Sequence, residues 1–373
     1  MTIINSHIHT FSIKNTPDNF LQYGMRKVPR VLHPILKRLL QQKKVARIAA
    51  RLIKNPFLSK HLAFVLIGLM ETQDLIFEEE KKAYPEGTKF VVLPLNFKFI
   101  GLGALQNSYT QQLDEMMEVK RKYPNTFLPF VHIDPRADTP TGNKNFLEKY
   151  IRKGFNGIKL YPPLGYYPFD PGLEKVYEFA VQHEIPIITH CGQGGIYFAG
   201  ETMPSEFQNP NSFVKDYVPK IEPSETNALF CDNFIHPDHF EAVFKKFPDL
   251  KVCFAHFGWD FYTGKGKALF KREELFEKIK NLLLNPDFPN IFTDVSYSLA
   301  DKAFNQMLLK EIENNPELAD KILFGTDFYM TTQEKQTESA LYLNFRKVMG
   351  ENIFQKIAVE NPKRFLQTVF FDV

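Results

Sequence analysis

Eight short apolar runs recur along the chain, and most of them are nearly continuous instead of alternating between apolar and polar positions. Strands that are buried on both faces of a parallel sheet have this pattern, because helices cover each face. The eight predicted strands are Thr2–Asn5, Lys89–Asn96, Phe127–Asp134, Gly157–Tyr161, Pro186–Cys191, Lys251–Phe257, Ile291–Ser296 and Ile322–Asp327.

Segments that carry apolar residues at helical spacing, with many charges, lie between these runs. Examples are Thr110–Tyr123, Gly172–His183, His236–Phe247 and Lys302–Asn314. Strands that alternate with helices in this way predict an α/β fold, the (β/α)8 TIM barrel. With 373 residues, of which 44% are hydrophobic, the chain is long enough for one such domain over residues 1–373, with insertions.

The longest interruption of the barrel pattern lies between the first two predicted strands, from Phe11 to about Pro85. We interpret residues 11–85 as a helical cap inserted after strand 1. Within it, Gly24–Lys60 holds eleven Lys and Arg residues and no Asp or Glu. The simpler interpretation is a cap packed on the barrel with its basic face in solvent. A basic amphipathic segment that binds a membrane or an acidic partner is the alternative.

A second long interruption, Gly194–Asn233, follows the predicted fifth strand and is rich in proline, asparagine and aromatic residues. We predict a long functional loop or lid there, because active-site loops of barrels follow the strands.

Composition excludes several classes of protein. A net charge of +3 gives no reason to expect a nucleic-acid partner. The longest apolar run, Leu62–Met70, has nine residues and is too short to span a bilayer. Met1 leads almost directly into a strand, so we expect no signal peptide. Cys191, Cys231 and Cys253 lack zinc-site spacing, which favours reduced thiols in a cytoplasmic protein.

The first candidate for chemistry is the stretch SHIHT, which contains His7 and His9. Two histidines two positions apart on a strand point to the same face. On its own this motif is weak, since two surface histidines give the same letters.

Polar residues also end three later apolar runs, namely His190, His256 and Asp327. The carboxyl ends of parallel barrel strands meet at one mouth, so these side chains should converge with the first two histidines. Imidazoles together with a carboxylate suit Zn²⁺, with Mn²⁺, Fe²⁺ or Co²⁺ as alternatives. The sequence therefore predicts a metal site at this mouth.

Six motifs run in order along nearly the whole chain: SHIHT, GFNGIKLYPP, PIITHCG, VCFAHFG, ILFGTDF and ENPKRFL. With these motifs the chain resembles the amidohydrolase superfamily, specifically the amidohydrolase-2 type that includes aminocarboxymuconate-semialdehyde decarboxylase-like proteins. By this resemblance His7, His9, His190 and Asp327 match the metal ligands. His256 matches a histidine that lies near the metal-bound water or the substrate.

Lys159 matches a lysine of the fourth strand. In binuclear members of the superfamily this lysine is carboxylated and bridges two ions. The G-x-K-L-Y-P setting here is more similar to the mononuclear subgroup, where the lysine binds an anionic substrate. We therefore expect one metal ion, and two ions joined by carboxylated Lys159 as the alternative.

The resemblance implies a metal-activated water that attacks an amide, ester or lactone bond of a small molecule. Asp327 would take the proton, and His256 would stabilise the oxyanion or transfer a proton. The decarboxylase relatives cleave C–C bonds with the same ligands, so a decarboxylase or hydratase of a carboxylated small molecule is the second hypothesis. A membrane-associated or binding protein that uses the basic segment is the third.

Aromatic residues just beyond the strand ends are candidates for substrate contacts, and rim packing explains each of them equally well. We also expect a homodimer as the default assembly. The candidate substrate-binding residues are Lys159, Tyr161, Trp259 and Tyr329, whereas His132, His236 and His239 are expected to be structural and Asp294 and Ser296 to support the site or substrate.

Overall fold

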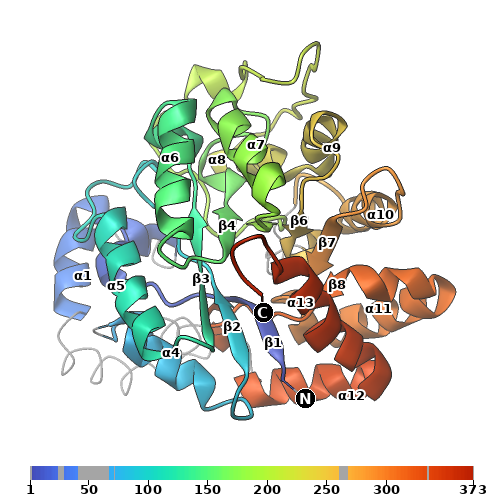
Figure 1. The fold of residues 1–373 in the computed structure, drawn as a ribbon. Coiled ribbons are helices and arrows are strands. Elements are labelled where there is room, and N and C mark those ends of the chain that lie inside the picture. Colours follow the sequence, from blue (N-terminus) through green and yellow to red (C-terminus); the bar gives the residue numbers. More distant parts are fainter. Residues whose placement is uncertain are drawn as a thin grey trace.

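The computed structural model of the chain describes residues 2–23, 29–40, 67–70, 72–259, 268–333 and 336–372. Eight parallel strands form one sheet in the sequential order β1 to β8. Helices surround this sheet, as Figure 1 shows. This confirms the predicted TIM barrel. The strands are β1 Ile4–Ile8, β2 Lys89–Val92, β3 Phe127–His132, β4 Gly157–Leu160, β5 Ile187–Thr189, β6 Val252–Phe254, β7 Ile291–Asp294 and β8 Ile322–Leu323.

The first and last strands both differ from their predicted bounds. β1 continues through the polar residues Asn5 and Ser6 to Ile8, so His7 lies inside the strand. β8 ends after two residues, although its apolar run continues to Asp327. Four residues farther on, the backbone of Asp327 has a φ of 63°, in the left-handed region, so an extended conformation does not continue through that residue.

The barrel closes between β8 and β1 through a few contacts instead of a full ladder. Ser6 N donates to Phe324 O at 2.7 Å, and Asp327 N donates to His7 O at 2.8 Å. Gly325 allows this approach, because a Cβ built there would lie 2.8 Å from the Cβ of His7. The β8–β1 seam therefore brings together the segments that carry His7, His9 and Asp327.

Helices cover the outside of the sheet, and the predicted helix Lys302–Asn314 agrees with α11. Aromatic and branched side chains between strands and helices form the larger core. The helices are α1 His33–Leu40, α4 Gln73–Lys81, α5 Tyr109–Lys122, α6 Pro140–Ile151, α7 Glu174–His183, α8 Asn227–Phe230, α9 Pro237–Lys246, α10 Arg272–Leu283, α11 Lys302–Asn314, α12 Glu338–Gln355 and α13 Asn361–Leu366.

A second apolar cluster fills the inside of the barrel. Seven of the eight strands contribute to it, with residues such as Ile4, Phe130 and Ile188. In β4, Ile158 and Leu160 belong to the outer core, so the residue between them, Lys159, points inward. A buried lysine therefore stands where the other strands place apolar side chains.

The predicted cap, residues 11–85, is described only in part. Residues 24–28 and 41–60 of the predicted basic segment Gly24–Lys60 lie outside the described residues. Lys37 of α1 donates through Nζ to Pro17 O at 3.2 Å, which ties this helix to the chain beyond β1. α4 lies against α5, where Gln73 Nε2 donates to Gln112 O at 2.9 Å, so the last part of this range belongs to the outer ring.

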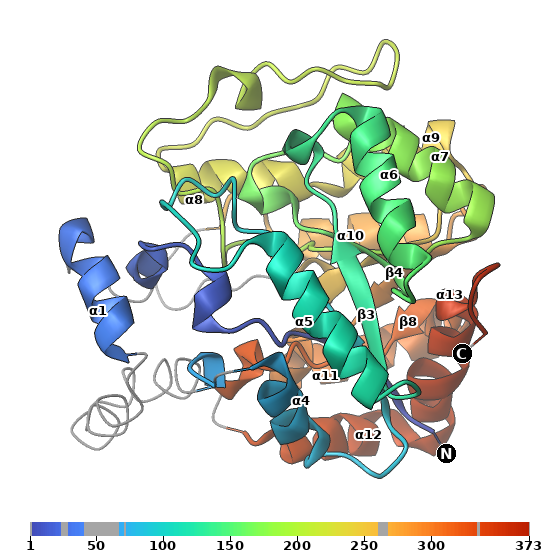
Figure 2. The same ribbon diagram turned by 60° about the vertical axis from the view of Figure 1, so that its left-hand side comes forward.

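The long segment after β5 has little regular structure, in agreement with the predicted loop. Besides α8, it contains the short 3-10 helix Ser205–Phe207 and the start of a second one, Cys231–Ile235. Figure 2 shows it as an extended yellow-green loop above α8, at the edge of the molecule. Among the described residues, no helix has both the length and the apolar character needed to cross a membrane.

Candidate metal centre

His7, His9 and Asp327 come together at the β8–β1 seam, and we call them the trio. Their potential ligand atoms all lie within 4.8 Å of one another. Asp327 Oδ1 is 3.2 Å from His9 Nε2 and 3.7 Å from His7 Nε2. Each of the three residues is at most 3% exposed. The structure therefore brings together three of the four predicted metal ligands.

Hydrogen bonds set the tautomer of both histidines in the trio. His7 Nδ1 lies 2.8 Å from Asp294 Oδ2, and His9 Nδ1 lies 2.7 Å from the carbonyl oxygen of Leu93. Both partners only accept hydrogen bonds, so each Nδ1 carries the proton. Both Nε2 atoms then present lone pairs toward Asp327.

This donor set fits a divalent cation. His7 Nε2 and Asp327 Oδ1 are buried and have no hydrogen-bond partner among the described residues. Burial, with a smaller effect of Lys159, keeps the pKa of His7 well below its usual value, so the ring is neutral. Two lone pairs and a carboxylate oxygen repel one another unless a cation lies between them. Imidazole nitrogen and carboxylate oxygen are common ligands of Zn²⁺.

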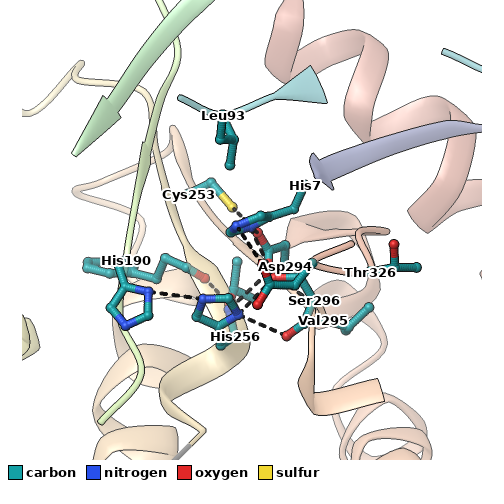
Figure 3. Close-up of polar contacts among 12 residues, drawn as sticks. His7, Leu93, His190, Cys253, His256, Asp294, Val295, Ser296 and Thr326 are labelled. Carbon is teal, nitrogen blue, oxygen red and sulfur yellow. Dashed lines mark hydrogen bonds and ion pairs between the residues drawn. The ribbon is translucent and has the colours of Figure 1, made fainter. Parts of the chain in front are cut away.

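His190 and His256 form a second set, the histidine pair, which Figure 3 shows beside His7 and Asp294. His190 Nδ1 lies 3.2 Å from His256 Nε2, and His190 Nε2 lies 2.9 Å from Gly192 O. Burial lowers the pKa of His256 to about 4 and that of His190 well below its usual value. His190, the fourth predicted ligand, therefore contacts His256 and is outside the trio in this arrangement.

Asp294 and Ser296 connect the two sets, and sequence reasoning gave them only a supporting place. Asp294 Oδ1 accepts from His256 N at 2.9 Å, while its other oxygen holds His7. Ser296 Oγ lies 2.9 Å from His256 Nδ1 and 3.0 Å from His7 Nδ1. Asp294 ends β7, the same signal that singled out the residues at the other strand ends.

The two predicted catalytic residues both have unusual backbones. His256 has a φ of 69° and Asp327 a φ of 63°, whereas side-chain-bearing residues rarely adopt the left-handed region. Hydrogen bonds hold both conformations, from His256 N to Asp294 and from Asp327 N to His7 O. Local strain of this kind is concentrated at functional sites.

Lys159 is fully buried on β4, and its Nζ has no hydrogen-bond partner among the described residues. Burial lowers its pKa to about 8, and the carboxylates of Asp294 and Asp327 act in the opposite direction. The side chain therefore lies within electrostatic reach of the trio, with Nζ 5.6 Å from the ring centre of Tyr161.

The three aromatic candidates have different contacts. Tyr161 stacks on His190, with ring centres 4.2 Å apart. The guanidinium carbon of Arg272 lies 3.6 Å from the ring centre of Trp259. Tyr329 is 1% exposed and donates to Phe11 O at 2.7 Å. All three side chains are buried, and Tyr161 is in direct contact with a candidate ligand.

Three other histidines have structural contacts. His132 Nδ1 accepts from Asn96 N at 2.7 Å, and the ring is buried. His236 caps the first turn of α9, and His239 Nδ1 lies 2.7 Å from the hydroxyl of Tyr217. None of the three belongs to a candidate metal group among the described residues.

A comparison with known protein families identifies the class of protein to which this fold and site belong. The family model described as amidohydrolase matches residues 101–368. This is most of the chain, and the chain belongs to the amidohydrolase family of enzymes.

Solved structures share the fold at low identity. A probable 2-pyrone-4,6-dicarboxylic acid hydrolase from Acinetobacter baumannii, with citric acid bound, is 13% identical, with a TM-score of 0.55 over 98% of this chain and 99% of that chain. A 4-oxalomesaconate hydratase from Rhodopseudomonas palustris is 16% identical, with a TM-score of 0.51 over 98% and 95%. A 5-carboxyvanillate decarboxylase from Novosphingobium aromaticivorans, with manganese and 4-hydroxy-3-methoxy-5-nitrobenzoic acid, is 12% identical, with a TM-score of 0.51 over 98% and 96%.

Proposed function

We propose that the chain is a metal-dependent hydrolase that uses one divalent ion, Zn²⁺ in the first instance, on an amide, ester or lactone bond of a small molecule. The observation that carries this proposal is the trio, in which two imidazole nitrogens face one carboxylate oxygen, and His7 Nε2 and Asp327 Oδ1 are buried without a hydrogen-bond partner among the described residues. His7, His9 and Asp327 are the proposed ligands, and His190 is the fourth.

A divalent ion held there supplies a water of lowered pKa and polarises the substrate carbonyl. Asp327 has a second carboxylate oxygen besides the one that faces the histidines. We assign it the role of general base, because it stands at the mouth and can take the proton of the attacking water.

His256 is the proposed partner of the leaving group or oxyanion. Its Nδ1 faces Ser296 and its Nε2 faces His190, so a proton reaching the ring has defined acceptors on both sides. Burial lowers its pKa to about 4, so the neutral ring is the resting form. A protonated ring would therefore pass its proton on readily.

Lys159 favours a second candidate, a decarboxylase or hydratase of a carboxylated small molecule. A buried ammonium without a hydrogen-bond partner is suited to a substrate carboxylate. The three proteins that share the fold are named for acids: a dicarboxylic acid hydrolase, an oxalomesaconate hydratase and a carboxyvanillate decarboxylase. The manganese in one of them also supports Mn²⁺ as an alternative ion.

Tyr161, Trp259 and Tyr329 are the proposed aromatic wall of the substrate site. Tyr161 is the strongest of them, because it stacks on His190 and lies beside Lys159. We also place the protein in the cytoplasm, a proposal that rests on three buried free thiols.

The proposal is tested by metal analysis and by a paired assay. Purified wild type and His9→Ala are loaded with Zn²⁺, and bound metal is measured by mass spectrometry, with His183→Gln on α7 as the matched control. We expect about one ion per wild-type and control chain and a large loss in His9→Ala. A folded wild type that takes up no divalent ion contradicts the proposal.

The reaction is then resolved with two substrate panels. Esters and lactones are followed by acid release, and carboxylated aromatics by CO₂ release. Hydrolysis that is lost in Asp327→Asn supports the first candidate. CO₂ release without hydrolysis supports the second candidate.

A further inference from the structure

Asn5 joins the two ligand-bearing strands at the β8–β1 seam. Its side-chain oxygen accepts from His7 N at 3.3 Å and from Thr326 N at 3.2 Å. The residue is fully buried. Thr326 directly precedes Asp327, so one amide group holds the backbone beside two of the proposed metal ligands.

The other end of the same amide reaches oxygen atoms behind the seam. Asn5 Nδ2 lies 2.9 Å from Thr326 Oγ1, 3.1 Å from the hydroxyl of Tyr84 and 3.4 Å from Glu80 Oε1. Because these partners require a donor and the two backbone N–H groups require an acceptor, the orientation of the amide is determined.

Two buried carboxyl groups complete this cluster. Glu80 of α4 is 1% exposed. Glu338 of α12 accepts from the hydroxyl of Tyr84 at 2.8 Å and from that of Thr331 at 3.2 Å. Burial, together with the neighbouring Glu338, raises the pKa of Glu80 well above its usual value, and burial also raises that of Glu338.

The contacts of the pair favour one retained proton. The side chains that face the two carboxyl groups are hydroxyls and one amide, and Tyr84 is the other titratable group acting on the pair. Two buried carboxylates side by side cannot both ionise readily without a cation. Glu338 accepts from two hydroxyl groups, whereas Glu80 has the long contact with the amide of Asn5 and faces Glu338 itself, so the proton belongs on Glu80.

We propose that Glu80 as a carboxylic acid and Glu338 as its carboxylate partner form a positioning unit, which acts through Asn5 and Thr326 to set the spacing of His7 and Asp327 for the metal. This inference rests on the proposed function, since it concerns the same metal centre. The unit touches neither substrate nor ion, so its members are positioning residues.

The test compares substitutions that keep or remove the hydrogen bonds of the unit in the full-length protein. Affinity for Zn²⁺ is measured by competition with a chromophoric chelator, and folding by circular dichroism. Glu80→Gln keeps the shape and the donor of the acid, and we expect wild-type affinity. Glu80→Ala removes both, and we expect about a 10- to 100-fold loss of affinity in a folded protein. Glu79→Gln, on the exposed side of the same helix, is the control and should not change affinity.

The pH dependence of stability separates a protonated Glu80 from a merely buried one. An unfolded chain ionises this carboxyl near 4.5, while the folded state keeps the proton at higher pH. Stability is therefore lost as the pH rises from that value through the raised pKa of the folded state. Glu80→Gln cannot ionise, so its melting temperature should fall less than that of wild type as the pH is raised from that value.

Thr326 gives a second variant pair if Glu80→Ala does not fold. Thr326→Val removes the hydroxyl at nearly constant shape and should weaken Zn²⁺ binding, and Thr326→Ser should restore it. Wild-type affinity in Glu80→Ala or in Thr326→Val overturns this inference alone, as does a loss of affinity in Glu80→Gln equal to that in Glu80→Ala. A wild type that binds no divalent ion overturns the proposed function as well.

Discussion

The trio and the histidine pair lie at the same mouth but use their nitrogen atoms differently. In the trio, each Nδ1 is tied to an acceptor and each Nε2 faces a carboxylate. In the histidine pair, one ring nitrogen of His190 contacts His256 and the other contacts the carbonyl oxygen of Gly192. The comparison teaches that histidines at strand ends are not equivalent. The trio is arranged to bind a cation as it stands, whereas His190 must first give up one of its hydrogen bonds.

The largest effect is expected at Asp327, which belongs to the trio and is also the proposed base. Asp327→Asn keeps the shape but loses the charge, so kcat/KM should fall by about 10³-fold or more. Steady-state kinetics on metal-loaded protein measure this, with bound metal determined in parallel. Activity within tenfold of wild type would remove Asp327 from both roles.

The comparison itself is tested by His9→Ala against His190→Ala. Loss of His9 opens the trio, whereas loss of His190 leaves its three donors in place. We therefore expect His9→Ala to weaken Zn²⁺ binding the more, by at least about 10-fold relative to His190→Ala. Chelator competition gives both dissociation constants. An equal or larger loss in His190→Ala would mean that His190 turns toward the ion when metal binds.

A smaller effect is expected when the trio is left whole but loses its support. Asp294→Asn replaces the carboxylate that holds His7 Nδ1 and the backbone of His256. Loss of such support for a metal-binding histidine typically costs about 10- to 100-fold in metal affinity. Titration with Zn²⁺ measures the change, and Asp301→Asn at the start of α11 is the surface control. Unchanged affinity contradicts the role assigned to Asp294.

At His132 we expect the smallest effect on metal binding and a clear effect on the stability of the protein at low pH. This ring accepts from Asn96 N and belongs to neither set. Burial lowers its pKa to about 3, whereas the unfolded chain takes up the proton near 6.5. Stability is therefore lost as the pH falls from about 6.5 toward 3. His132→Gln should lose less stability over that window in thermal melts, and it should bind Zn²⁺ as wild type does. If His132→Gln loses as much stability at low pH as wild type does, His132 does not contribute to that loss.

Much of the fold follows from patterns that are local in the sequence. Continuous apolar runs mark the strands, because both faces of a parallel sheet are covered. Once the strands are arranged as a barrel, their carboxyl ends meet, which places His7, His9 and Asp327 at one mouth. The helix at 302–314 follows in the same way from its apolar spacing.

Other features depend on contacts that no local pattern specifies. The pairing of Asp294 with His7 joins β7 to β1, which are not neighbours in the sheet. β8 ends at Leu323 and Asp327 has a left-handed backbone conformation, and the apolar run indicates neither feature. The side chain of Asn5 contacts Thr326, which lies 321 positions away in the sequence. His190 as a ligand stays a prediction.

The short β8 also has a consequence for how the whole chain is held together. At the seam the last strand of the barrel meets the first, and few ladder hydrogen bonds join them. An ion shared by His9 and Asp327 would act as a clasp on that circle. Amide hydrogen exchange should therefore slow on metal loading at both ends of the barrel sheet together, in β1 and around β8, and less in the middle strands β3 and β4.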